Sequence, residues 1–335
     1  MKLFFPRTLL VVAGLGLLAC VKAAAPAEEA VFRPLATTHA ALAMAEKWPA
    51  SPPTHLGAAD SSALQRWWKP AAGLALLAVA FLWWLALRPS NNREWSPEYA
   101  ETPWAEIKGD EVIIHNFRNC DYRTETDFAA RWETRTVHLS KLRGLDLFMN
   151  YWGSRHIAHT LLSFDFGDEG RVCTSIETRR ERHERYSAVR GFFRQYELYY
   201  VIGDEGDLVR VRTNYRNQDV YLYRLANADP EKYRALFLTY LRSANNLRAR
   251  PRWYHATLNN CTTNIRLNAQ ASGFRTPWNW RVLINGYLDE LLHQRGMIDS
   301  SLAFAETKAR AQISERARAA ANATDFSERI RIPLP

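Results

Sequence analysis

The stretch IAHTLLSFDFGDEGRVCTSIET, residues 157–178, contains the pattern that decides the fold class. An apolar run over residues 157–166 is followed by the turn sequence Gly167-Asp168-Glu169-Gly170 and by a second β-prone segment over 171–178. Two β-prone segments joined by a short turn with glycines are typical of an antiparallel hairpin. The sequence therefore predicts two neighbouring strands here.

Strands dominate before residue 229 and helices after it. Further strands are predicted over residues 112–114, 136–139, 196–202, 208–213 and 220–224. Asp229-Pro230-Glu231 combines a capping residue, a proline suited to the first helical position and an acidic first turn, so it predicts a helix to about Leu247. Other helices are predicted from near Asn260, over 278–294 and over 303–321. This order predicts an α+β domain over residues 106–335, with an antiparallel sheet packed on helices.

The region before this domain is predicted to begin with a targeting segment. Residues 1–25 have a basic start, an apolar stretch and three alanines at 23–25, which is typical of a signal peptide or a first membrane segment. Leu17-Leu18-Ala19-Cys20 also resembles a lipidation sequence, with Cys20 as the modified residue. Residues 26–66 are rich in alanine and proline and predict a flexible spacer.

Residues 67–88 predict a transmembrane helix. The stretch 71–87 carries no charge, and the tryptophan pairs at 67–68 and 83–84 suit the two membrane interfaces. Residues 89–105, with three prolines, are interpreted as a linker. Two topologies stay open. A cleaved signal at 1–25 would let this helix return the chain to the cytoplasm, whereas a start at Met44 would place residues 89–335 outside.

The composition excludes a disordered chain, because 47% of the residues are hydrophobic. Lys and Arg outnumber Asp and Glu by 44 to 35, and 36 of the 44 are Arg. Such a balance suggests nucleic acid or an anionic membrane, or reflects an arginine-rich genome. The densest arginine run, 179–185, is interleaved with acidic residues and is more typical of a solvated loop, so no nucleic-acid partner is predicted. No pair of cysteines has the spacing of a zinc site, and neither a metal nor a cofactor is predicted.

Cys261 is the candidate nucleophile. It lies in Asn259-Asn260-Cys261-Thr262-Thr263, where polar capping residues precede an apolar-periodic segment. A thiol at a helix N-terminus has a lowered pKa, and the free N–H groups there can receive an oxyanion. An ordinary buried or capping cysteine is the alternative. Cys120 and Cys173 would either pair with each other in an oxidising compartment or stay separate buried thiols.

His159 is the candidate base and Glu177 its candidate orienting partner. His159 precedes the inward-facing apolar run of the first hairpin strand, and Glu177 lies on the second strand. His156 points to the opposite face, because strand residues three apart do so, which also makes a shared metal site with His159 and Glu177 a weak alternative. A structural core histidine and an ion pair of Glu177 with Arg179 or Arg180 are the other interpretations.

Eight further segments follow one another in a recognisable order along the chain: 117–123, 159–164, 175–179, 194–198, 211–214, 219–223, 260–263 and 326–331. Together they resemble one bacterial family, the Lnb N-terminal periplasmic domain, whose namesake is a lipoprotein N-acyltransferase. The resemblance covers roughly residues 110–331.

This resemblance implies a circularly permuted NlpC/papain-like fold after an N-terminal membrane anchor. Carried over by position, it implies His159 as base, Glu177 as its partner and Cys261 as nucleophile. The expected function is that of a membrane-tethered acyltransferase or acyl hydrolase, which acts on membrane lipid or lipoprotein through an acyl-thioester intermediate. The catalytic domain is expected in the periplasm, and the anchor is expected in the bacterial inner membrane. Alternatives are an NlpC-like amidase or peptidase on cell-wall peptide and a non-enzymatic envelope binding module.

Overall fold

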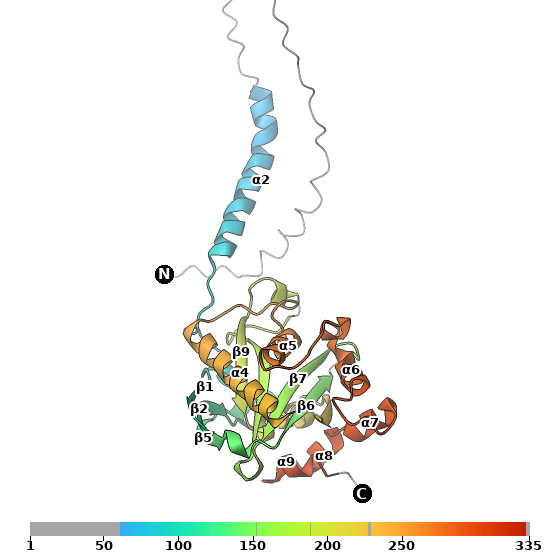
Figure 1. The fold of residues 1–335 in the computed structure, drawn as a ribbon. Coiled ribbons are helices and arrows are strands. Elements are labelled where there is room, and N and C mark those ends of the chain that lie inside the picture. Colours follow the sequence, from blue (N-terminus) through green and yellow to red (C-terminus); the bar gives the residue numbers. More distant parts are fainter. Residues whose placement is uncertain (1–60, 152, 188, 227–228, 333–335) are drawn as a thin grey trace, which may run out of the picture. The chain divides into compact units, whose positions relative to one another are not determined.

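A computed structural model describes residues 61–151, 153–187, 189–226 and 229–332. The described residues fall into two units, one that ends at Leu87 and one that begins at Arg88 (Figure 1). The predicted targeting segment 1–25, with Cys20, and most of the predicted spacer 26–66 lie outside the described residues.

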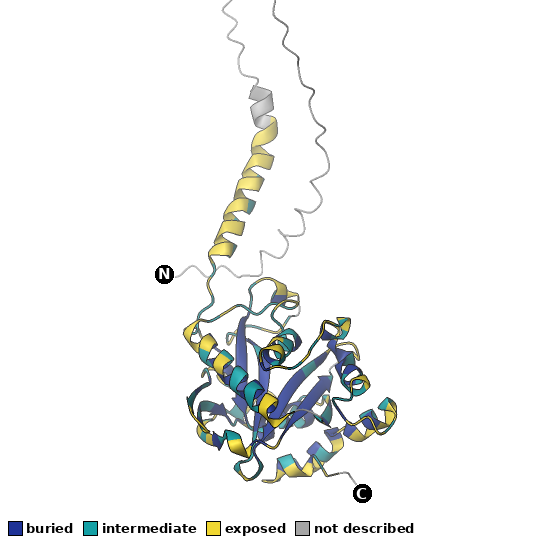
Figure 2. Cartoon of the chain, in the orientation of Figure 1, coloured by how far each residue is buried: buried dark blue, intermediate teal, exposed yellow. Residues whose placement is uncertain are grey.

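The described part of the first unit is one helix, α2, Ser61–Ala86. Its segment Arg66–Ala86 is long and apolar enough to cross a membrane, with a mean hydropathy of 1.6 and no buried residues. Large apolar side chains, such as Leu76 and Trp67, are exposed along it (Figure 2). A helix apolar on all sides suits lipid rather than water, which agrees with the anchor predicted over 67–88.

The second unit is built around an eight-stranded sheet, so its α+β class is as predicted. The strand order is β1-β2-β9-β8-β7-β6-β10, and β5 also pairs with β2. Every ladder is antiparallel except a single parallel bridge between β2 and β9. In chain order the strands are β1 Trp104–Lys108, β2 Glu111–Arg118, β5 Trp132–His138, β6 Gly144–Tyr151, β7 Ala158–Asp165, β8 Arg171–Arg179, β9 Glu197–Gly203 and β10 Asp219–Arg224; a small separate sheet pairs β3 Asp121–Tyr122 with β4 Phe128–Ala129.

The predicted hairpin is confirmed as β7 and β8. Leu161 pairs with Ser175, and Asp165 pairs with Arg171 across the turn. Gly170 in that turn has a φ of 84°, a conformation that glycine adopts without steric cost. Alternate residues of β7 face opposite cores: Leu162 packs in the larger apolar cluster and Leu161 in the smaller one.

Helices cover both faces of the sheet. On one face α4, Pro230–Ala249, and α5, Cys261–Ala271, pack with Phe164 in the larger cluster (Figure 1). On the other face Phe148 and Leu161 pack with Ile313 and Phe326 near the C-terminus. The remaining helices are α3 Glu205–Leu208, α6 Leu288–Gln294, α7 Phe304–Ala311, α8 Ser314–Ala319 and α9 Phe326–Arg329.

The strand predicted over 208–213 is wrong, because this segment is helical. Asp204 caps α3 by accepting a hydrogen bond from the Gly206 N–H, and a π-helical turn follows over Val211–Tyr215. The acidic side chains at the start of this segment are buried against arginines, Asp207 against Arg118 and Glu205 against Arg331. These tertiary ion pairs fix a helical backbone that the β-branched composition alone does not favour.

Two predicted long helices are shorter than expected. Only Leu288–Gln294 of the segment 278–294 is α-helical, and 303–321 is broken at Gln312, whose backbone is extended between α7 and α8. Strand β6 was not predicted. It is buried along nearly its whole length, so it lacks the alternation that marks a half-exposed strand.

Residues 89–105, interpreted from the sequence as a linker, pack as part of the second unit. Trp95 and Tyr99 are buried, and β1 already begins at Trp104. The buried guanidinium of Arg179 donates to the carbonyl oxygens of Tyr99 and Ala100, each at 2.9 Å. This arrangement satisfies backbone groups that a free linker would leave to water.

Candidate active site

The thiol of Cys261 lies at the first residue of α5. Asn260 is the N-cap, and it exchanges two hydrogen bonds with Thr263: the Thr263 N–H donates to Oδ1 at 2.8 Å, and the Asn260 N–H donates to Oγ1 at 2.9 Å. This reciprocal pair fixes where the helix begins. The N–H groups of a first helical turn lack partners within the helix and favour negative charge.

His159 and Glu177 meet across the β7–β8 pair. The His159 Nε2 atom is 3.1 Å from Glu177 Oε1 and 2.7 Å from Ser175 Oγ, and that hydroxyl also donates to Glu177 Oε1 at 2.7 Å. Because an ionised carboxylate only accepts hydrogen bonds, Nε2 carries a proton here. The ring nitrogen left for the thiol is therefore Nδ1.

Glu177 is held ionised by Arg212. The Arg212 guanidinium lies 2.5 Å from Glu177 Oε1 and is itself buried. Burial raises the pKa of Glu177, but the charges of His159 and Arg212 outweigh burial and hold this pKa well below its usual value. The alternative ion pairs are absent: Arg179 bonds backbone carbonyls, and Arg180 pairs with Glu98 at 3.4 Å.

The thiol and the imidazole shift each other toward their charged forms. Burial raises the pKa of Cys261, but its hydrogen bond to His159 and the imidazolium charge outweigh burial and lower it overall. The Thr262 hydroxyl and the Thr160 N–H help in the same direction. Burial lowers the pKa of His159, whereas the Glu177 charge and the Cys261 contact raise it, to about 9 overall. A thiolate–imidazolium pair is the state that this environment favours.

The other described cysteines have the opposite environment. Cys120 and Cys173 are both buried and both free, so they are separate thiols rather than a disulfide. Burial raises the pKa of Cys120 to about 12 and that of Cys173 well above its usual value. Among the three cysteines that the structure describes, only Cys261 has a lowered pKa.

Asn285 ties the two halves of the site together. Its Oδ1 accepts from the Ala158 N–H at 2.9 Å, and its Nδ2 donates to Thr262 Oγ1 at 2.7 Å and lies 4.0 Å from Cys261 Sγ. The side chain thus links the residue before His159 to the residue after Cys261. The same loop holds His156 away from the thiol, because the Tyr287 hydroxyl lies 2.7 Å from His156 Nδ1.

Three polar side chains of the site were not singled out from the sequence. Ser175 had a weak signal, since its position two residues before Glu177 on one strand puts both side chains on the same face. Arg212 lies in segment 211–214, one of those that carry the family resemblance, but that segment was predicted as a strand and no role was assigned to the residue. Asn285 had no signal, because it comes from a segment whose secondary structure was predicted only partly right.

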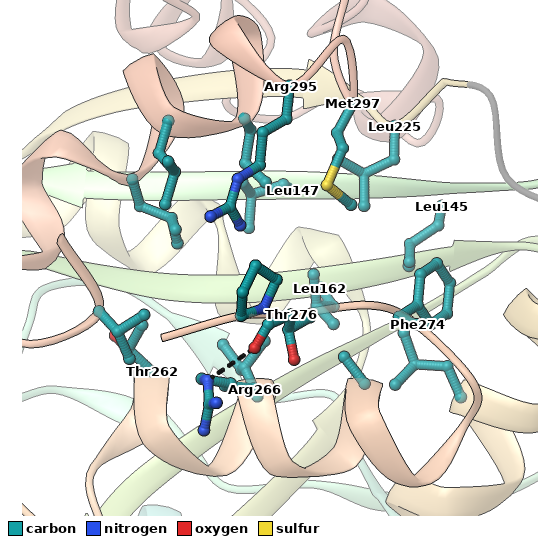
Figure 3. A pocket seen from close by; sticks show the side chains of 18 residues that line it. Leu145, Leu147, Leu162, Leu225, Thr262, Arg266, Phe274, Thr276, Arg295 and Met297 are labelled. Carbon is teal, nitrogen blue, oxygen red and sulfur yellow. Dashed lines mark hydrogen bonds between the residues drawn. The ribbon is translucent and has the colours of Figure 1, made fainter. Parts of the chain in front are cut away.

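An apolar cavity of about 110 Å³ adjoins the site. Thr262, next to Cys261, lies at one side of it, and Leu145, Leu225 and Phe274 lie at the other (Figure 3). The lining comes from β6, β7, α4, α5, α6 and the loops beside them, and it is apolar except for two threonines and two arginines. A space with this lining suits an apolar ligand better than water.

The comparisons with known proteins give one match. Residues 128–286 match the family model of the Lnb N-terminal periplasmic domain. No curated protein and no solved structure matches the chain. The matched segment includes His159, Glu177 and Cys261, and it supports the predicted family and an envelope setting.

Proposed function

We propose that this protein is a cysteine-dependent acyltransferase or acyl hydrolase, tethered to the bacterial inner membrane, that acts on lipid or lipoprotein acyl groups in the periplasm. The observation that carries the proposal is the Cys261 thiol at the start of α5, with its pKa lowered by His159, whose other ring nitrogen meets ionised Glu177. A nucleophile, a base and an orienting acid in this order are the components of a thiol enzyme. The order His159, Glu177, Cys261 along the chain is also what a permuted papain-like fold would have.

In the proposed reaction the Cys261 thiolate attacks the acyl carbonyl carbon and forms a C–S bond. The oxyanion of the tetrahedral intermediate faces the N–H groups of the first turn of α5. As the intermediate collapses, the carbon–oxygen or carbon–nitrogen bond breaks, and the His159 imidazolium gives its proton to the leaving alcohol or amine. An amine or water then attacks the thioester, His159 takes the proton of that nucleophile, and the thiolate leaves. Glu177 stays ionised and holds the ring throughout.

Two features favour an acyl substrate. The cavity beside Thr262 has an apolar lining that suits a hydrocarbon chain. The apolar helix Arg66–Ala86 would keep the domain at a bilayer, which raises the effective concentration of lipid substrate. These features distinguish the proposal from a peptidase, which needs polar groups to bind a peptide backbone.

The proposal is tested by labelling the full chain with a thiol-directed lipid probe in membranes. We expect Cys261→Ser to abolish labelling, because a serine hydroxyl is not ionised by His159. Cys120→Ala serves as the control and should label like wild type, since Cys120 is buried in a different cluster. Labelling that survives Cys261→Ser would contradict the proposal, as would release of cell-wall peptide fragments without any lipid turnover.

The cavity makes a separate prediction about chain length. Ala269 lines the cavity from α5, so Ala269→Phe should shorten the acyl chain that fits. Each methylene excluded from an apolar site costs about 0.8 kcal/mol. The ratio of kcat/KM for long and short acyl esters should therefore fall in this variant. Leu267→Phe, on the exposed side of the same helix, is the control and should leave the ratio unchanged; an equal fall in both variants would contradict the assignment.

A further inference from the structure

We infer that four loops around Cys261 form a docking face for the surface of an anionic phospholipid bilayer. The loops are residues 153–157, 182–195 without residue 188, 252–260 and 276–287. This inference goes beyond the proposed reaction and does not depend on it, because it rests on the surface around the site rather than on the thiol.

Exposed apolar side chains are concentrated on these loops. Within the described part of the second unit, every exposed large hydrophobic residue except Leu267 and Ile332 lies on one of the four. The most exposed of them are Leu258, at 74%, and Trp278, at 59%. Apolar groups gathered on one face in this way mark an interaction surface.

The loops join in pairs on either side of the site. In the first pair the Ala256 N–H donates to the Gly191 carbonyl at 3.1 Å, and the rings of Phe192 and His255 are 5.8 Å apart. In the second pair the Gly286 N–H donates to the His156 carbonyl at 2.9 Å. Cys261 directly follows one loop of the first pair, and His159 follows one loop of the second. The exposed apolar groups therefore flank the entrance to the thiol.

The charge of this face is mainly positive, because the four loops carry seven Arg and one acidic residue, Glu184. Residues 232–288, which include two of the loops, contain eight Arg and one Lys but no Asp or Glu. Four exposed arginines on the loops make no ion pair within the described residues: Arg155, Arg182, Arg185 and Arg252. Some exposed arginines elsewhere form such pairs, as Arg123 does with Asp127 and Arg329 with Asp325, whereas others, such as Arg242, do not.

A bilayer is the partner that these groups fit best. Tryptophans and exposed apolar groups insert at the headgroup level, while unpaired arginines bind anionic headgroups.

The test is hydrogen–deuterium exchange of the full chain in lipid nanodiscs. One set contains phosphatidylethanolamine with phosphatidylglycerol, and the other contains phosphatidylcholine alone. We expect backbone amides of the four loops to exchange at least about fivefold more slowly in the anionic discs, with the difference lost in 1 M salt. Exchange in β5 should be the same in both.

Variants separate docking from folding and from catalysis. The double variant Leu258→Ser/Trp278→Ser should lose the protection, whereas Ile332→Ser, an exposed site off the face, should keep it. Cys261→Ser should be protected like wild type, so a failure of the proposed reaction leaves this result intact. Equal exchange in the two lipids, protection that survives the double variant, or protection that appears only when a soluble envelope extract is added would overturn the inference.

Discussion

Glu177 is the residue on which the reactivity of the thiol depends. Its charge is the first contribution that raises the pKa of His159, and His159 in turn lowers the pKa of Cys261. Glu177→Gln should therefore lower the pKa of His159 from about 9 and raise that of Cys261, so the bell-shaped profile of kcat/KM against pH narrows from both sides. We expect kcat to fall by roughly 10²-fold or more.

The same substitution leaves the buried Arg212 without its anion, which costs about 3–5 kcal/mol of stability. Ser175→Ala is the matched control, because it removes a hydrogen bond to the same carboxylate but keeps the charge. It should move the pH profile much less. Profiles that coincide for wild type and Glu177→Gln would show that the carboxylate does not act through His159.

The raised pKa of His159 also makes stability depend on pH. A group whose folded pKa lies above its unfolded value adds stability below the unfolded pKa and loses that contribution as the pH rises through the folded pKa. The free energy of unfolding of wild type minus that of His159→Gln should therefore be largest below about pH 6.5 and decrease until about pH 9. Denaturant titrations at several pH values measure it, and a difference that grows over this range would contradict the assigned charge state.

The sequence was informative about the three central residues because each has a local signal. Cys261 follows capping residues, and His159 and Glu177 lie on the two arms of a hairpin whose turn is recognisable. Arg212 and Asn285 could not be found in this way. Each reaches the site through tertiary packing, Arg212 from a segment whose helical backbone is set by the buried pairs of Glu205 and Asp207.

At the scale of elements, the start of α5 controls where the thiol lies. The side chain of Asn260 accepts from the Thr263 N–H and so fixes the first turn. Asn260→Ala should reduce the free energy of unfolding by about 1 kcal/mol. It should also raise the pKa of Cys261, because a frayed first turn holds the thiolate less well. Thermal unfolding and the pH dependence of alkylation measure the two effects.

Asn279 offers the matched control for that variant. It caps a short 3₁₀ turn, Trp280–Val282, by accepting from the Arg281 N–H at 3.0 Å. Asn279→Ala should affect stability alone and leave the pKa of Cys261 unchanged. If both variants shifted the alkylation profile equally, the N-terminus of α5 would have no special effect on the thiol.

Elements whose sequences carry a clear turn or capping signal were predicted best. The β7–β8 hairpin and α4 have strong turn or cap signals and lie near their predicted bounds. Strand β6 was missed because it is buried on both faces and so lacks an alternating pattern. The segment 278–294 begins with two 3₁₀ turns, at Trp280–Val282 and Asn285–Tyr287, and hydrophobic periodicity does not distinguish such turns from an α-helix.

At the scale of the whole molecule, the globular unit begins at Arg88, earlier than residue 106, the boundary predicted from the sequence. A fragment that begins at Arg88 should fold, because it keeps Trp95, Tyr99 and β1. A fragment that begins at Glu106, the boundary predicted from the sequence, loses these groups and leaves the buried Arg179 without the Tyr99 and Ala100 carbonyls. We expect it to be insoluble or to unfold at a much lower temperature. Equal melting temperatures would show that residues 88–105 are a linker after all.

The most direct test of the account is peptide mapping of the full chain after incubation in phospholipid nanodiscs. An acyl-thioester should be found on Cys261, should be cleaved by hydroxylamine, and should be absent from Cys261→Ser and His159→Ala. Cys120 and Cys173 should stay unmodified, because burial raises the pKa of both thiols. An acyl group found on another residue, or none on Cys261 while lipid is still consumed, would contradict the assignment of Cys261 as the nucleophile.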